Sequence, residues 1–306
     1  MNVGIIGSGA MGCTVGGFLS EAGADVVIYE IERSIVDAIE SNGVRIEMNG
    51  STDILVDVPV SDDPTDFDVV DAAFVLTKSF DTAAAVAQAT PMIGPETHIV
   101  TIQNGIYNYD YLVDSYGVDR VVGGYTYSGA NTIAPGHVRF IGPKPTVIGG
   151  GDRTFVHDLG EILSQAGLPT DVVNDPEPHI WKKQLWNVAR KPISALCELR
   201  NGPQAEFEET RLVATHLIEE AMAVARARNI EILSDDPVGD FLVPVKPAHY
   251  DKKSSILEDV QAGRRTEIEA INGAIVEYAD ELGIDVPYNR AVTALVRAKE
   301  RGYLQS

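Results

Sequence analysis

Three glycines near the amino terminus have the spacing of a loop that binds a dinucleotide. Gly7, Gly9 and Gly12 follow the apolar residues 2–6 and lead into a stretch of helical composition. In this pattern the first glycine allows a tight turn, the second lets the backbone approach a pyrophosphate, and the third lets the helix pack on the strand. The pyrophosphate would lie at the amino end of the helix, where free N–H groups attract an anion. We expect the whole loop to bind a cofactor: Gly7, Ser8, Gly9, Ala10, Met11 and Gly12.

An acidic residue stands where such a loop distinguishes NAD from NADP. Glu30 ends the second apolar run, residues 25–29. A carboxylate at this position accepts hydrogen bonds from the ribose hydroxyls of NAD and repels the 2′-phosphate of NADP. Glu32 adds negative charge, whereas Arg33 could offset part of it. The sequence therefore favours NAD(H) over NADP(H) and leaves NADP open.

The carboxyl-terminal half contains two further polar groups that could take part in chemistry. Lys183 and Asn187 are four residues apart, so one helix face carries both, and together they could bind a carbonyl group. Thr266 is placed to cap a helix, with Glu267 in its first turn, where the helix dipole stabilises a carboxylate. Spacing alone favours a solvated lysine, a capping or exposed asparagine and a glutamate that only stabilises its helix.

Taken together, these segments resemble the ketopantoate reductase (2-dehydropantoate 2-reductase) family over almost the whole chain. The resemblance implies that the chain reduces 2-dehydropantoate with NAD(P)H, a step of pantothenate and coenzyme A synthesis. Residues 255–273 are the most specific part of the match. The other matching segments are Gly-Ser-Gly-Ala-Met-Gly at 7–12, Thr77-Lys78, Gln103-Asn104-Gly105, Lys183 with Asn187, and Asn201-Gly202.

The resemblance also implies a role for each matching residue. Lys183 corresponds to the family's catalytic lysine, which acts as general acid on the substrate carbonyl. Glu267 corresponds to the carboxylate that bonds the substrate hydroxyl and helps to place the lysine. Asn104, Asn187 and Ser255 correspond to substrate ligands, with Ser255 on the carboxylate side.

A lysine suits this reaction. Negative charge develops on the carbonyl oxygen as hydride reaches the 2-oxo carbon, and a positioned ammonium stabilises that charge and donates the proton. A free lysine has a pKa of about 10.4, and we expect partial burial of Lys183 to lower it.

Two more positions concern the cofactor and the substrate. Lys78 resembles a residue near the cofactor's ribose and phosphate, and Asn104 is expected near the nicotinamide ribose as well as the substrate. Lys191 departs from the family, which usually has an asparagine one turn after Asn187 and before a proline. Either Lys191 points elsewhere, or the substrate has extra negative charge or a different polar group. We count Lys191 among the substrate-binding residues.

The elements that must position these residues fall into two groups. Apolar runs alternate with helical stretches up to residue 123, short β segments, some of them antiparallel, follow to residue 148, and a helix is expected at 153–166. This alternation predicts the α/β class, with a Rossmann doubly wound parallel sheet. We assign residues 1–173 to this dinucleotide-binding domain and residues 174–306 to an all-helical C-terminal domain that binds substrate, with a cleft between them.

The second domain is predicted from its helical periodicity. Pro192 is expected to kink or end the first of its helices. Residues 235–247 are expected to form a loop. The predicted helices are 178–197, 206–229, 250–262, 266–283 and 287–302.

Composition excludes several classes of protein. Hydrophobic residues make up 44% of the 306 residues, which is typical of a globular chain. The net charge of −21 argues against a nucleic-acid partner, which would need a basic face, and fits either a high-salt cytoplasm or ordinary solubility. No apolar run reaches the ~18 residues of a membrane helix. With no signal-peptide pattern before the first strand, we expect a cytoplasmic protein without a membrane partner.

Cysteine and histidine usage is unremarkable for such an enzyme. Cys13 and Cys197 are too few for a disulfide framework, and both are expected to be buried as small hydrophobes. The six histidines are scattered, so we predict no metal site. A homodimer through the helical domain is left open.

Three functions are compatible with these residues. The first is reduction of 2-dehydropantoate to pantoate, with Lys183 as general acid. The second keeps the fold and the hydride chemistry but acts on a different 2-oxo or hydroxy acid, as Lys191 would allow. The third is a nicotinamide-sensing binding protein without turnover.

Overall fold

In a computed structural model, which describes residues 1–48 and 53–305, the chain divides into two compact units. The first comprises residues 1–103 and 108–176. The second comprises the chain from Glu177 onward together with residues 104–107. A short piece of the amino-terminal half therefore belongs to the second unit.

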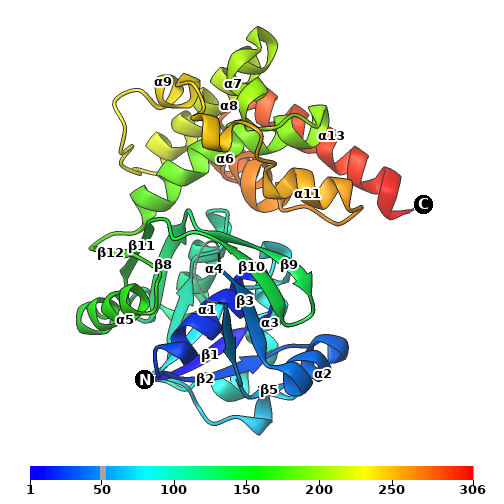
Figure 1. The fold of residues 1–306 in the computed structure, drawn as a ribbon. Coiled ribbons are helices and arrows are strands. Elements are labelled where there is room, and N and C mark those ends of the chain that lie inside the picture. Colours follow the sequence, from blue (N-terminus) through cyan, green and yellow to red (C-terminus); the bar gives the residue numbers. More distant parts are fainter. Residues whose placement is uncertain (49–52, 306) are drawn as a thin grey trace. The chain divides into compact units, whose positions relative to one another are not determined.

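The first unit is built on a largely parallel sheet (Figure 1). Within the described part of the chain its strand order is β12-β11-β8-β7-β6-β1-β2-β5. The run from β5 to β8 is parallel throughout, with β1 central, which is the order of a dinucleotide-binding sheet. β11 pairs antiparallel with β8 and parallel with β12. The strands are β1 Asn2–Ile6, β2 Asp25–Tyr29, β5 Val60–Ser61, β6 Ala72–Val75, β7 His98–Thr101, β8 Val121–Thr126, β11 Thr146–Gly150 and β12 Thr170–Val173. The predicted Rossmann fold is confirmed.

A second sheet was not predicted from the sequence. Its described strands have the order β4-β3-β10-β9. They are β3 Val44–Glu47, β4 Ile54–Val56, β9 Gly129–Ala134 and β10 His137–Ile141. Helix α1, Ala10–Glu21, contacts all four of these strands and also contacts β1 and β2 of the main sheet. Because α1 packs against both sheets, it needs no polar face, and its one hydroxyl side chain before Ser20, Thr14, is buried and donates to the Ala10 carbonyl.

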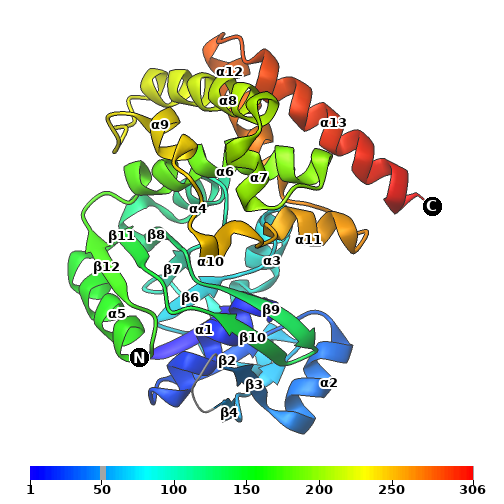
Figure 2. The ribbon, with the colours of Figure 1, turned by 45° about the horizontal axis from the view of Figure 1, so that its top comes forward.

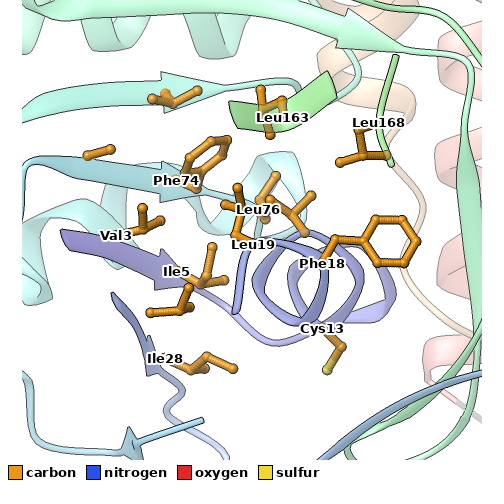
Figure 3. Close-up of a cluster of buried hydrophobic side chains, with 14 of the residues drawn as sticks. Val3, Ile5, Cys13, Phe18, Leu19, Ile28, Phe74, Leu76, Leu163 and Leu168 are labelled. Carbon is orange, nitrogen blue, oxygen red and sulfur yellow. The ribbon is translucent and has the colours of Figure 1, made fainter. Parts of the chain in front are cut away.

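The core of the first unit surrounds α1 (Figure 3). Phe18 of α1 meets Phe140 of the second sheet edge-on, with ring centroids 4.9 Å apart. Cys13 is buried here as expected, and burial raises the pKa of its thiol to about 12, so it is not a reactive thiolate. The expectation for Cys197 is wrong, since this residue is exposed. The remaining helices of this unit are α2 Arg33–Asn42, α3 Thr82–Gln88, α4 Tyr107–Tyr116, whose first residue belongs to the second unit, and α5 Arg153–Gln165.

The second unit is helical over its described residues, as predicted (Figure 2). Its longest helix, α6, packs against α8, α11 and α13. A short π-helical segment, Glu269–Gly273, precedes α12 and contacts α6 and α13. The helices are α6 Glu177–Cys197, α7 Asn201–Glu206, α8 Glu208–Ala227, α9 Pro237–Leu242, α10 Pro247–Tyr250, α11 Ser255–Gln261, α12 Ala274–Leu282 and α13 Pro287–Leu304.

Two predicted boundaries in this unit differ from the structure. Helix α6 ends at Cys197, as predicted, so Pro192 does not end it. The predicted loop 235–247 contains α9, whose amino end is capped by the Asp236 side chain with Pro237 in the first helical position. The predicted helix 250–262 is broken, because Ser254 caps a new helix, α11, through its bond to the Leu257 amide.

Candidate active site

The glycine-rich loop has the geometry that its spacing predicts. Gly7 adopts a φ of +91°, and a Cβ there would lie 2.6 Å from the Thr77 side chain. A Cβ on Gly12 would lie 2.0 Å from the Gly7 carbonyl oxygen, so only glycine lets the helix approach the strand. A Cβ on Gly9 would meet no atom within 4 Å. The backbone at Gly9 thus faces open space, as the approach of a pyrophosphate requires.

The amino end of α1 is suited to an anion. Gly9 is its N-cap, and no side chain caps the helix there. The first turn contains no acidic residue that would repel a phosphate. The amides of a first helical turn have no partner within the helix, and the dipole adds positive potential. The residues present therefore fit the diphosphate of a dinucleotide.

Glu30 is fixed beside this loop. Its side chain is 8% exposed, and Oε2 accepts hydrogen bonds from the Ser8 amide at 2.8 Å and the Ser8 hydroxyl at 2.7 Å. Oε1 accepts from the Glu32 amide at 2.9 Å. The carboxylate therefore also holds the loop in place, which the sequence did not reveal.

Arg33 does not offset the Glu30 charge in the way that its position suggested. Its guanidinium bonds Asp37 at 2.8 Å and Asp62 at 3.1 Å, and it also approaches Glu40. These three acidic side chains raise the pKa of Arg33 and neutralise its charge locally. Lys78, a further predicted cofactor residue, follows Thr77, which lies against Gly7 in the same unit.

In the second unit, Asn104 joins Lys183 to Glu267. Nζ of Lys183 donates to Oδ1 of Asn104 at 2.9 Å, and Nδ2 of Asn104 donates to Oε2 of Glu267 at 3.3 Å. Asn104 reaches this position because the chain turns at Gly105, where φ is +92° and a Cβ would lie 2.5 Å from the Ala270 carbonyl oxygen. Lys183 and Glu267, which are 79 and 163 positions from Asn104 along the chain, thus form one group with it.

The surroundings of Lys183 lower its pKa to about 7. Burial is the largest cause, because it disfavours the charged form, and repulsion from Lys191 acts in the same direction. The carboxylate of Glu267 opposes both effects. A lysine with this pKa exchanges its proton near neutral pH, as a general acid must.

Lys191 points toward a predicted substrate ligand. Its side chain is 9% exposed, and Nζ donates to the Ser255 hydroxyl at the start of α11. Lys183, Asn187 and Lys191 follow one another at intervals of four residues, so they line one face of α6. Asn187 is partly buried between the two lysines. The structure therefore places Lys183, Asn187 and Lys191 on one face of α6 and Ser255 next to it, at the start of α11. The other two residues predicted to act on the substrate, Asn104 and Glu267, are joined to Lys183 by hydrogen bonds through Asn104.

The segment around Glu267 differs from its prediction. Glu267 precedes the helix instead of lying in its first turn, and Thr266 bonds the Ile268 amide through its hydroxyl at 3.3 Å. The buried carboxylate of Glu300, on α13, accepts a hydrogen bond from the Thr266 amide at 2.7 Å. The wider π-helical turns that follow shift the start of the regular helix to Ala274. The chain around Glu267 is thus held by the Thr266 hydroxyl and by Glu300 of α13.

Two buried amides that the sequence reading missed tie this segment to α6. Gln184, next to Lys183, donates to the Ile271 carbonyl at 2.9 Å. Asn272 donates to the Val188 carbonyl at 2.9 Å. The sequence signalled this connection only by a glutamine directly after the candidate lysine. The role of that glutamine depends on a tertiary contact, which the sequence does not show.

Residues 1–48 and 53–305 contain no cluster of His, Cys, Asp and Glu side chains that could hold a metal ion. In the same part of the chain, no helix combines the length and apolar character needed to cross a membrane.

Known proteins match the chain over both halves. The family model described as "Ketopantoate reductase PanE/ApbA" matches residues 3–153, and the model for its C-terminal part matches residues 175–300. A 2-dehydropantoate 2-reductase from Aquifex aeolicus is 32% identical over 307 residues, which covers 97% of this chain and 96% of the relative.

Solved structures agree with these matches. The crystal structure of a PanE/ApbA family ketopantoate reductase from Ralstonia eutropha is 33% identical, with a TM-score of 0.90 over 99% of this chain and 100% of that one. D-mandelate dehydrogenase, solved with NADH and anilino(oxo)acetate, shares the fold at 23% identity, with a TM-score of 0.92 and the same coverage of both chains.

Proposed function

The chain belongs to the ketopantoate reductase PanE/ApbA family, and from this we propose that it reduces 2-dehydropantoate to pantoate. It is accordingly an oxidoreductase that uses a nicotinamide dinucleotide. The observation that carries the proposed reaction is the group formed by Lys183, Asn104 and Glu267, in which the lysine has a pKa of about 7. The cofactor, when bound, supplies hydride to the 2-oxo carbon.

The side chains of the second unit supply the proton. Lys183 in its ammonium form bonds the carbonyl oxygen, stabilises the charge that develops there, and transfers one proton to it. The product is a hydroxyl group, and the lysine is left as the neutral amine. Asn104 orients Lys183 through its amide oxygen. Glu267 accepts a hydrogen bond from the new hydroxyl and favours the charged form of the lysine in the next cycle.

The remaining predicted residues bind the two substrates. Lys191, Ser255 and Asn187 hold the 2-oxo acid, with Ser255 on the side of its carboxylate. Gly7–Gly12 and Lys78 hold the cofactor, and Asn104 contributes to both. Residues 1–173 accordingly bind the cofactor and residues 174–306 the substrate, with Asn104 as the exception that contacts both.

We propose that NAD(H) is preferred over NADP(H). The support is the buried Glu30 carboxylate, which is fixed beside the loop by Ser8 and Glu32. Arg33, the nearby cation, is engaged by three acidic side chains and does not offer its charge to a 2′-phosphate. A second phosphate at the ribose would meet an uncompensated carboxylate.

A second candidate substrate is another 2-oxo acid, and Lys191 is the observation that favours it. The buried ammonium at this position adds a positive charge that suits an acid with a further anionic or polar group. A cytoplasmic location and a homodimer stay predictions.

One experiment tests these proposals together. The purified chain is mixed with NADH or NADPH and with each member of a panel of 2-oxo acids that includes 2-dehydropantoate, and the loss of reduced-cofactor absorbance is followed. We expect the highest kcat/KM for 2-dehydropantoate with NADH. A better acid in the panel would replace the proposed substrate, and no oxidation with any acid would overturn the proposed reaction.

A further inference from the structure

The substrate-binding face of α6 contains two amine side chains that act on each other. Lys183 and Lys191 are eight residues apart on this face, and the charge of Lys191 disfavours the charged form of Lys183. The Lys191 ammonium is buried and bonded to the neutral Ser255 hydroxyl. Its positive charge is therefore felt strongly by groups nearby, because little water is present to screen it.

We propose that Lys191, with Ser255, binds the carboxylate of the 2-oxo acid and that this contact makes Lys183 take up a proton when the substrate binds. The inference rests on the proposed function and adds a coupling between the two lysines. Above pH 7, the enzyme would thus charge a larger share of its general acid when an anionic substrate is in place.

The direction of the effect follows from the charges of Lys183, Lys191 and the bound carboxylate. In the enzyme without substrate, repulsion by Lys191 contributes to a Lys183 pKa of about 7. A carboxylate bound to Lys191 compensates that positive charge, so the repulsion falls and the pKa of Lys183 rises. At a pH above 7, more of the lysine is then protonated in the complex than in the free enzyme.

Two charges shift the pKa of Lys183: Lys191 lowers it, and Glu267, from the segment before the π-helical turns, raises it. Arg190, the cation next to Lys191, lies over the rings of Trp186 and Phe241. Four ion pairs engage other charged side chains on α6 and on the elements packed against it: Asp259 with Arg264, Glu269 with Arg297, Glu198 with Lys299, and Glu177 with Arg228. Of the two groups that shift Lys183, Lys191 is the one whose charge an anionic substrate would oppose.

The first test compares the kinetics of K191M and K191R with the unaltered enzyme and NADH. Methionine keeps the length of the side chain without its charge, so we expect the KM for 2-dehydropantoate to rise about 10- to 100-fold, whereas K191R retains most of the affinity. K182M is the matched control, since Lys182 is the exposed neighbour of Lys183 on the same helix, and it should behave as the unaltered enzyme. An unchanged KM in K191M would overturn the carboxylate contact.

The second test measures proton uptake directly. Pantoate is titrated into the enzyme saturated with NADH, a complex that cannot react, and the heat is measured near pH 8 in two buffers of different ionisation enthalpy. We expect uptake of a fraction of one proton per site with pantoate and none with its uncharged lactone. K191M should take up less than the unaltered enzyme, because the repulsion that pantoate relieves is absent in that variant. Equal uptake by K191M and the unaltered enzyme, or no uptake by either, would overturn the coupling.

These outcomes are separable from failure of the proposed function. If neither reduced cofactor is oxidised with 2-dehydropantoate, the proposed function fails and the coupling falls with it. If 2-dehydropantoate is reduced but K191M matches the unaltered enzyme in KM and proton uptake, only the coupling fails. The comparison of pantoate with its lactone uses the unaltered enzyme, so the link between the carboxylate and proton uptake is tested even where K191M does not fold.

Discussion

Asn272 supplies the hydrogen bond that Pro192 cannot make. In a regular helix the amide of residue 192 would donate to the carbonyl of Val188, four residues earlier, but proline has no N–H. Nδ2 of Asn272 lies 2.9 Å from that carbonyl oxygen and takes the place of the missing donor. Helix α6 therefore continues past Pro192 to Cys197, and Lys191 stays on the same face as Lys183.

This relationship predicts energetic coupling between the two positions. N272L removes the substitute donor and should lower the free energy of unfolding by about 1–3 kcal/mol, because a buried carbonyl loses its partner. In a P192A background the alanine amide can serve the same carbonyl, so N272L should cost less there. Urea denaturation of the two single variants and the double variant measures the coupling, which we expect to exceed about 0.5 kcal/mol. Strictly additive effects would show that Asn272 does not substitute for the missing amide.

Lys183 should be needed for the chemical step and not for cofactor binding. We expect K183A to lower kcat by about 10²- to 10⁴-fold, the usual contribution of a general acid. Binding of NADH, followed by fluorescence, should be unchanged, because the glycine-rich loop lies in the other unit. K182A, the exposed neighbour, serves as control. Near-normal turnover in K183A would remove Lys183 from its role.

Burial of Lys183 should lower the free energy of unfolding by an amount that depends on pH. Its pKa is about 7 in the folded chain and about 10.4 in an unfolded one, so between these values the unfolded state binds more protons and stability rises with pH. K183M removes this cost. We expect the variant to be more stable than the unaltered protein, most of all below pH 7, with the difference shrinking as the pH approaches 10. Urea denaturation across this range measures it, and a difference that does not change with pH would contradict the lowered pKa.

Glu30 should set the cofactor preference. E30Q removes the negative charge but keeps an oxygen that can accept from Ser8. We expect the ratio of kcat/KM for NADPH to that for NADH to rise about tenfold or more, mainly through KM. E21Q makes the same change of charge at the exposed carboxyl end of α1, away from the loop, and should leave the ratio unaltered. If E30Q and the unaltered enzyme show the same ratio, a residue other than Glu30 distinguishes NADH from NADPH.

Glu300 is a positioning residue for Glu267, since it holds the Thr266 amide from α13. E300L should lower kcat about tenfold with little change in KM, because Glu267 loses its support, while E300Q keeps an acceptor and should restore most of the activity. Steady-state kinetics separates the two parameters. If E300L raises KM alone, or if E300Q fails as badly as E300L, the role is not that of positioning Glu267.

Much of this architecture followed from local patterns in the sequence. The loop at Gly7–Gly12 and the strands around it have strong periodic and glycine signals, and the comparison with known families confirms the fold. The second sheet was missed because its short strands pair across long stretches of chain, such as β3 with β10, and two-residue periodicity over four or five residues is a weak signal. The sequence predicted the end of α6 at residue 197 but could not show that the helix continues through Pro192, because the substitute donor is Asn272, 80 positions later in the chain.

The candidate site shows the same limit. Lys183 and Glu267 were found through family resemblance, and their spacing alone did not distinguish them from solvated side chains. Their connection through Asn104, and the buried supports Gln184 and Glu300, depend on tertiary contacts. The direction of Lys191 was open in the sequence for the same reason, and its bond to Ser255 resolved it.

The membership of residues 104–107 in the second unit affects how this protein can be dissected. A gene cut between residues 176 and 177 would encode a carboxyl-terminal fragment with Lys183 and Glu267 but without the amide that joins them. The fragment would lack a structural piece that lies more than 70 codons upstream. Activity in a pair of separately expressed halves therefore requires complementation, in which the amino-terminal half contributes Asn104 to the other half's lysine.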